Sequence, residues 1–273
     1  MAINNSVNTN VGAFTALRNL NSAQSSQDRT QNRISTGQRV SGALDQAAIF
    51  AIAQSIRGEL GANAAVQQGL NQTAGVVNVA TAGATGVSNL TQDIQGKLVE
   101  LSNPALTGEQ QGIIQNDLNA LIEQAQGFVD NASFNGTNLL QSGSGDLNTL
   151  QNLDGDSLTV SGQGSVGDAL ANLAAADFSD PASVLSNEFA AFQTTLNSSL
   201  GELGASSRRI VAQNDQLQGI SDATEEGLGN LVDANLGREA ARLAADQARS
   251  QLSQLSLGIA NRSPEVVLGL FRS

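Results

Sequence analysis

The sequence of 273 residues contains no cysteine, histidine, tryptophan or tyrosine, and only one methionine. Without histidine or cysteine the chain cannot build a structural zinc site, a cysteine nucleophile or a Ser-His-Asp relay, so only carboxylates, one lysine and the arginines could act. The motifs of an EF-hand, a Walker A loop and a dinucleotide-binding glycine loop are also missing. The composition therefore predicts a protein that is not an enzyme and needs no cofactor or metal.

Long apolar runs are absent as well. No stretch of about 18 apolar residues exists, so we expect no membrane span. The first residues, MAINNSVNTNVGAF, lack the basic and apolar regions of a cleavable secretory signal. The missing Sec signal still permits export by a machine that reads the protein differently.

Basic residues are scarce in the middle of the chain. Residues 58–207 hold fifteen acidic residues against Lys97 alone, a net charge of −14, whereas residues 1–57 carry +3 and residues 208–273 carry −1. We interpret the nearly neutral ends as surfaces buried against other chains and the acidic middle as a solvated face. An acidic protein without such a division is the alternative. In either case the lack of a basic patch predicts no nucleic-acid partner.

What the sequence does contain is a long apolar repeat. Steps of four and three residues from Ile52 to Leu101 meet apolar residues at eleven of fifteen positions, with no proline between them. An apolar residue every 3.5 positions over about seven heptads is the pattern of a coiled coil and predicts a rod of roughly 75 Å. Because such a rod cannot bury its own stripe, the chain must supply partner helices.

The N-terminal segment has the same repeat, but the helix is expected to break before the rod. Between residues 21 and 45 the repeat lands only on polar residues and glycine, and Gly37 and Gly42 flank the break. Glycine is the usual residue just past a helix end. We predict a first helix over about residues 6–34, an ordered connector, and the rod from about residue 44.

The segment after the rod predicts a shorter helix and then a hairpin. The rod should end before Pro104, and Thr107 with Gln110 forms a capping box for a helix that folds back antiparallel on the rod. Further on, Asp154-Gly155 lies between two alternating runs, which indicates a β-hairpin. Asp180-Pro181 then marks the start of another helix.

The heptad repeat returns at Leu185 and continues through Ala234 and beyond Gly237. This segment is the partner that the first rod requires. The expected fold is mainly α, a long antiparallel coiled-coil bundle built from the N- and C-terminal halves, with a small β-hairpin region in the middle. The terminal helices are then left to pair with each other and to order on association, or to extend the bundle as a longer rod.

Several motifs in this sequence resemble those of bacterial flagellin. The predicted connector reads Arg33-Ile34-Ser35-Thr36-Gly37-Gln38-Arg39-Val40, which is similar to the family pattern I-S-[ST]-G-x-[RK]-[IV]. The resemblance covers about residues 1–140 and 195–273, and the short middle is similar to the compact flagellins of alphaproteobacteria. Further matches, in the order of the family, are Phe134-Asn135-Gly136, Leu203-Gly204-Ala205, Asn230-Leu231-Val232-Asp233-Ala234 and Ile259-Ala260-Asn261.

The resemblance implies a structural subunit that polymerises into the extracellular filament of the bacterial flagellum and serves motility. The near alternative is a hook–filament junction protein, whose ends are similar. The implied division places the filament core in residues 1–44 and 236–273. It places the helical bundle in residues 45–140 and 185–235, and a surface-exposed hairpin region in residues 141–184.

The implied partners are copies of the same chain, alone or mixed with other flagellins. The flagellar type III export apparatus, an export chaperone that recognises the C-terminus, the filament cap and hook-junction proteins follow from the same resemblance. A membrane-surface protein is the less favoured class, because the apolar side of residues 236–260 is mostly alanine and that helix includes acidic residues.

Polymerisation is expected to bury the apolar stripes of the two terminal helices among many copies. Arg33, Arg39 and Arg57 either pair with acids across subunits or remain solvated. The predicted interface residues are Ile3, Val7, Phe14, Leu17, Arg33, Arg39, Leu252, Leu255, Ile259, Val266, Leu270 and Phe271.

Overall fold

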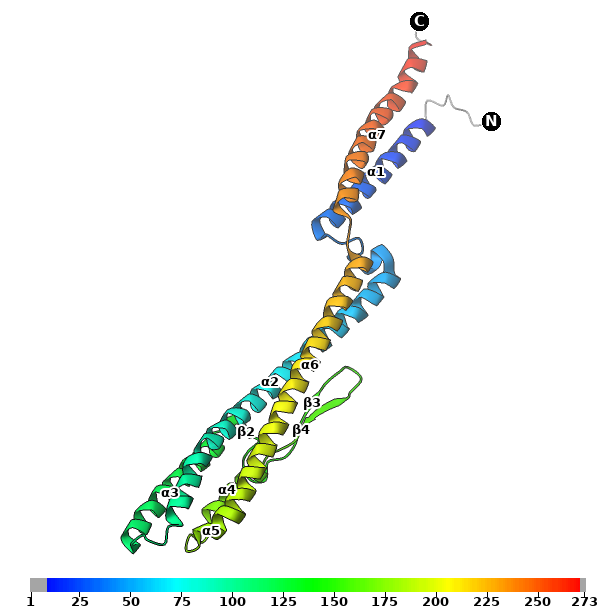
Figure 1. The fold of residues 1–273 in the computed structure, drawn as a ribbon. Helices are drawn as coiled ribbons and strands as arrows, with labels where there is room; N and C mark the ends of the chain where they lie inside the picture. Colours follow the sequence, from blue (N-terminus) through cyan, green and yellow to red (C-terminus); the bar gives the residue numbers. More distant parts are fainter. Residues whose placement is uncertain (1–8, 271–273) are drawn as a thin grey trace. The chain divides into compact units, whose positions relative to one another are not determined.

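The computed structural model describes the backbone of residues 9–270 and the side chains of residues 9–263, and it confirms the mainly α fold. Contacts divide the chain into two compact units. Residues 59–222 form one unit, and the described residues before Glu59 and after Asp222 form the other. In chain order (Figure 1) the elements are α1 (Val11–Thr36), α2 (Ala43–Leu101), α3 (Gly108–Asp130), β1 (Ser133–Phe134), β2 (Thr137–Asn138), β3 (Leu147–Leu150), β4 (Ser157–Val160), α4 (Ser165–Ala174), α5 (Pro181–Val184), the π-helical segment η1 (Leu185–Phe189), α6 (Ala190–Val232) and α7 (Leu236–Leu270).

The predicted seam of α2 forms one wall of the core of residues 59–222. Every predicted position from Asn63 to Leu101 is buried. Before Asn63 the prediction is wrong, because Ile52 is 51% exposed and its neighbour Ala53 is fully buried instead. Ala53 belongs to the other unit, so its burial is not part of this core.

Helix α3 begins at the predicted capping box. The hydroxyl of Thr107 accepts from the backbone of Gln110, whose side chain in turn accepts from the Thr107 backbone N–H. The helix folds back antiparallel on α2, as predicted, and Lys97 Nζ lies 3.2 Å from Asp117 Oδ2. The heptad repeat predicts Phe128 on the buried face, but Val129 is buried instead, because a straight α-helix drifts by about 20° per heptad from a 3.5-residue repeat. The buried residues are Ile114, Leu118, Ile122, Ala125 and Val129.

The predicted hairpin is present as β3 and β4, paired antiparallel with Leu147 opposite Val160. Gly155 in its turn has a φ of 96°, which favours glycine. A second, shorter hairpin of β1 and β2 turns at Asn135 and Gly136, both with positive φ.

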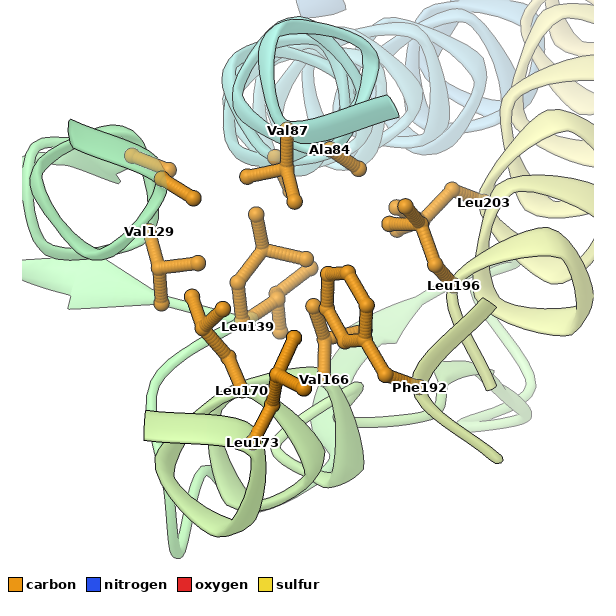
Figure 2. Close-up of a cluster of buried hydrophobic side chains, with 14 of the residues drawn as sticks. Ala84, Val87, Val129, Leu139, Val166, Leu170, Leu173, Phe192, Leu196 and Leu203 are labelled. Atoms are coloured by element: carbon orange, nitrogen blue, oxygen red, sulfur yellow. The ribbon is translucent and has the colours of Figure 1, made fainter. Parts of the chain in front are cut away.

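Helix α4 was not predicted, and it closes one side of the core. It contributes Leu170 and Leu173, which lie beside Leu139 and the ring of Phe192 (Figure 2). The region between the two halves of the bundle therefore adds to the hydrophobic core as well as to the surface.

Within the same unit, α6 runs opposite to α2 and supplies the facing wall (Figure 1). Gln213 leaves the seam and donates from Nε2 to the carbonyl of Gln151, at 2.8 Å, which ties the hairpin to α6. Beyond Leu217 the predicted seam is no longer buried. The buried seam residues are Phe189 at the end of η1 and, along α6, Phe192, Leu196, Ser199, Leu203, Ser206, Ile210 and Leu217.

Candidate functional site

Helices α1 and α7 lie side by side and run antiparallel (Figure 1). At one end of the pair, Asn10 caps α1 by accepting from Ala13 N at 2.9 Å and donates to the carbonyl of Ala260 at 2.6 Å. A Cβ placed on Gly12 would lie 3.8 Å from the Cβ of Ala260. The two backbones therefore approach closely at this end.

The most deeply buried side chains between the two helices are small or polar. Helix α1 buries Ala16, Ala23 and Thr30 at heptad spacing. The side of α7 that faces them buries acidic and hydroxyl side chains, namely Glu239, Asp246 and Ser250. Leu20, Leu243 and Leu257 lie on the same faces and are half-buried.

Asp246 lies near the middle of the seam and is 3% exposed. Its Oδ2 accepts from Ser26 Oγ at 2.8 Å and from Thr30 Oγ1 at 3.5 Å. Its Oδ1 lies 3.5 Å from the guanidinium of Arg249. Because buried carboxylates need hydrogen bonds and a countercharge, these three partners allow Asp246 to remain in the seam.

Glu239 occupies the equivalent position one heptad earlier and is 4% exposed. Its Oε1 lies 3.7 Å from Arg33 and 3.2 Å from Arg242. Within the described residues, Arg33 Nε and Glu239 Oε2 are buried without a hydrogen-bond partner. This second acid is therefore less fully satisfied than Asp246.

The apolar stripes of both helices point away from the seam. The residues that α7 places at the predicted heptad positions from Ala241 to Ile259 are all exposed. A polar seam holds the helices instead, so the apolar faces have no partner within the described chain. Five large apolar residues of the two stripes have between 43% and 72% of their surface exposed, namely Phe14, Leu17, Leu252, Leu255 and Ile259.

The other predicted interface residues fall into two groups. Ile3, Val7 and Phe271 lie outside the described residues, and Val266 and Leu270 belong to the part of α7 whose side chains are not described. The two arginines make contacts within the chain: Arg33 with Glu239, and Arg39 with the carbonyl of Leu231 and, at 3.1 Å, with Gln46.

A non-helical connector follows α1, as the glycines predict. Gly37 ends the helix in the left-handed conformation, with a φ of 70°. Backbone groups then join the connector to the junction of α6 and α7: Arg39 N donates to Val232 O at 2.7 Å, and Ala234 N donates to Gly37 O at 2.9 Å. Val40, in the same connector, is 1% exposed.

The connector ends in a carboxylate cap. Asp45 accepts from the backbone and hydroxyl of Ser41 and from the backbone of Gly42. These hydrogen bonds, those from Ser41 above all, hold the pKa of Asp45 below its usual range. Gln46 then has extended backbone angles, so the regular part of α2 begins after it.

The acids of the seam were not predicted as functional residues. A signal was available, because Glu239 and Asp246 are one heptad apart and so are Ala23 and Thr30 on the opposing helix. The apolar repeat instead predicts an interface on the opposite face of each helix. The polar repeat is the one that holds the pair together.

Nothing in this arrangement supports chemistry at a metal. Among the residues that the structure describes, no group of three or more His, Cys, Asp or Glu side chains is placed to hold a metal ion. No helix within that part of the chain is both long and apolar enough to cross a membrane. What the pair offers is exposed apolar side chains on both helices, beside a seam whose most deeply buried residues are polar or small.

Comparison with known proteins finds relatives along almost the whole chain. Residues 7–144 match the bacterial flagellin N-terminal helical region, and residues 190–271 match the bacterial flagellin C-terminal helical region. A flagellin of Brucella melitensis biotype 1 is 35% identical, with 98% of this chain and 99% of that protein covered. Flagellin FljM of Caulobacter vibrioides is 32% identical over the same shares of the two chains.

Proposed function

Because this chain belongs to the bacterial flagellin family, and is thus a structural filament subunit and not an enzyme, we propose that its copies assemble through the apolar stripe of α1 and α7. The observation that carries the proposal is the exposure of that stripe, with Phe14 and Leu17 on one helix and Leu252, Leu255 and Ile259 on the other. Each such side chain gains about 1.5–3 kcal/mol when it is fully buried.

The predicted interface extends beyond the described side chains. Ile3, Val7, Val266, Leu270 and Phe271 are proposed to continue the same stripe toward the ends of the chain. Arg33 and Arg39 are proposed to act by holding α7 and the connector in place, because both already have partners within the chain. Their contribution is then to the shape of the surface.

We propose that residues 1–44 and 236–273 form the filament core. Residues 45–140 and 185–235 would form the surrounding bundle, and residues 141–184 would face outward. The charge distribution supports this order, because the acidic residues gather in the middle of the sequence and the ends are nearly neutral.

The family also suggests a route to the filament. We propose export through the flagellar type III apparatus, with a chaperone at the C-terminus and with the filament cap and hook-junction proteins as assembly partners. The chain would then act outside the cell. The matched proteins are named flagellins, and no observation favours the junction-protein alternative.

Electron microscopy of the purified chain after seeding tests the proposal. We compare the full-length chain, a truncation lacking residues 1–44 and 236–273, and a variant with Leu252→Gln, Leu255→Gln and Ile259→Gln. A matched control carries Gln251→Ala and Gln254→Ala on the polar flank of α7, where both residues are exposed. We expect long tubes only from the full-length chain and the control. Tubes from the glutamine variant would refute the role of the stripe.

A further inference from the structure

We infer that Glu239 and Asp246 are specificity-determining residues that decide which faces of α1 and α7 meet within one chain. The inference rests on the proposed function in one respect, since it explains how the apolar stripe stays free for other copies. The two acids would favour the observed pairing of α1 with α7 over a pairing in which the apolar stripes of the two helices face each other within one chain.

The first step in the argument is the register of the pair. From Gly12 to Ser26 is two heptads along α1, and their neighbours Ala260 and Asp246 are two heptads apart on α7. One further heptad leads from Ser26 to Arg33, and the same step leads from Asp246 to Glu239. The antiparallel register is therefore constant, and both acids lie on it at the seam.

The second step is that burying these acids is a poor way to stabilise a helix pair. A buried carboxylate loses its hydration, and its ion pairs recover that loss only when the geometry is good. Here Glu239 Oε2 and Arg33 Nε are buried without a hydrogen-bond partner in the described part of the chain. The presence of Glu239 in the seam is therefore better explained by the choice of partner face, which is the role that buried polar residues have in coiled coils.

The third step compares the two possible pairings. If the helices met through their apolar faces, Leu17 and Leu255 would be buried and the surface for other copies would be lost. In that pairing Asp246 would leave Ser26 and Thr30, and Glu239 would leave Arg33. The acids therefore have their α1 partners only in the observed arrangement.

The chain offers a direct way to read the pairing, because it contains no cysteine. Gly12→Cys with Ala260→Cys reports the observed seam, since the 3.8 Å between the Cβ positions matches the usual spacing of about 3.8 Å in a disulfide. Leu17→Cys with Leu255→Cys reports a pairing through the apolar faces, because both residues are exposed in the observed arrangement. Each pair is introduced into the full-length chain and oxidised in dilute solution, and the monomer is separated before the disulfide is measured by mass.

Each reporter is then combined with Glu239→Ala and Asp246→Ala. We expect the yield of the Leu17/Leu255 disulfide, relative to the Gly12/Ala260 disulfide, to rise about tenfold or more, since hydrogen bonds to charged groups have about this effect on an equilibrium. Glu225→Ala with Glu226→Ala removes the same charge from exposed positions of α6 and should leave the ratio unchanged. Glu239→Gln with Asp246→Asn keeps one acceptor oxygen at each position and should restore part of the observed pairing.

The inference is overturned if both yields fall together in the alanine variant, because the acids would then merely stabilise the pair. An unchanged ratio overturns it as well, and so does a parent chain that fails to form the Gly12/Ala260 disulfide. The disulfides are read in the free chain and so do not depend on assembly. A full-length chain that forms no tubes would contradict the proposed function separately.

Discussion

Truncation of Leu255 to alanine should raise the concentration of free chain that coexists with filaments. Burial of a whole leucine side chain is worth about 1.5–3 kcal/mol. Leu255 retains 65% exposure, so its burial by neighbouring copies should contribute about 1–2 kcal/mol per subunit. That free energy corresponds to an increase of about 5- to 30-fold in the critical concentration.

The assay is sedimentation of seeded filaments at equilibrium, followed by measurement of the chain left in the supernatant. Because Leu255 is exposed, the substitution should leave the unfolding of the free chain unchanged, which circular dichroism can verify. Gln254→Ala, the neighbouring substitution on the polar flank, should change the critical concentration less than about twofold. An unchanged critical concentration for Leu255→Ala, or an equal rise for Gln254→Ala, would refute the assignment of the stripe.

Three further predictions concern the fold and the connector. Phe192→Ala removes a fully buried ring (Figure 2) and should lower the free energy of unfolding by about 3–5 kcal/mol. Urea titration followed by circular dichroism measures this change, because the chain has no tryptophan for fluorescence. Gly83→Ala places a Cβ 2.6 Å from that of Ala132 and should destabilise the chain by about 1–3 kcal/mol. Gly96→Ala has open space around the new Cβ and should stabilise the chain by about 0.5–1 kcal/mol. Equal effects of the two substitutions on the free energy of unfolding would contradict the packing described. Since Asp45 has a lowered pKa, its stabilising effect is complete above the usual carboxyl pKa of about 4 and is lost as the pH falls through its pKa in the folded chain. Ser41→Ala should raise the pKa of Asp45 in an NMR titration, and an unchanged pKa would exclude Ser41 as the main cause.

Much of the fold follows from local patterns in the sequence. The capping box at Thr107, the turn at Asp154-Gly155 and the helix end at Gly37 depend on residues within a few positions of one another, and each occurs as predicted. The seam of α2 from Asn63 onward is also local, because a heptad repeat specifies one face of a helix. Patterns of this kind can be recognised without any knowledge of the partner.

The parts that were missed depend on distant contacts. Helix α4 buries Leu170 and Leu173 against residues from several other elements. Val166, Leu170 and Leu173 have the spacing of an amphipathic helix, but a segment of 10 residues is too short to identify a helix by periodicity alone. The drift from Phe128 to Val129 on α3 results from the difference between 3.6 and 3.5 residues per repeat, which accumulates along a helix.

The seam of α1 and α7 shows the same limit for the candidate site. The apolar repeat identified Phe14, Leu17, Leu252, Leu255 and Ile259, but a repeat cannot tell whether its partner lies in the same chain or in another copy. The polar contacts of Asp246 with Ser26 and Thr30 settle that question for the intrachain pair. Those contacts join residues from opposite ends of the sequence.

The pairing of the connector with residues 232–234 sets which sequence changes the chain can tolerate. The contacts at Arg39 N, Val232 O, Ala234 N and Gly37 O are made by main-chain atoms, so exchange of exposed side chains there leaves them intact. A one-residue insertion or deletion between this pairing and α7 is a different matter, since each residue added to a helix turns the remainder of that helix by about 100°. Such a change would rotate the apolar stripe out of position while leaving every helix intact. The short link between this pairing and α7 should therefore vary in composition but keep its length.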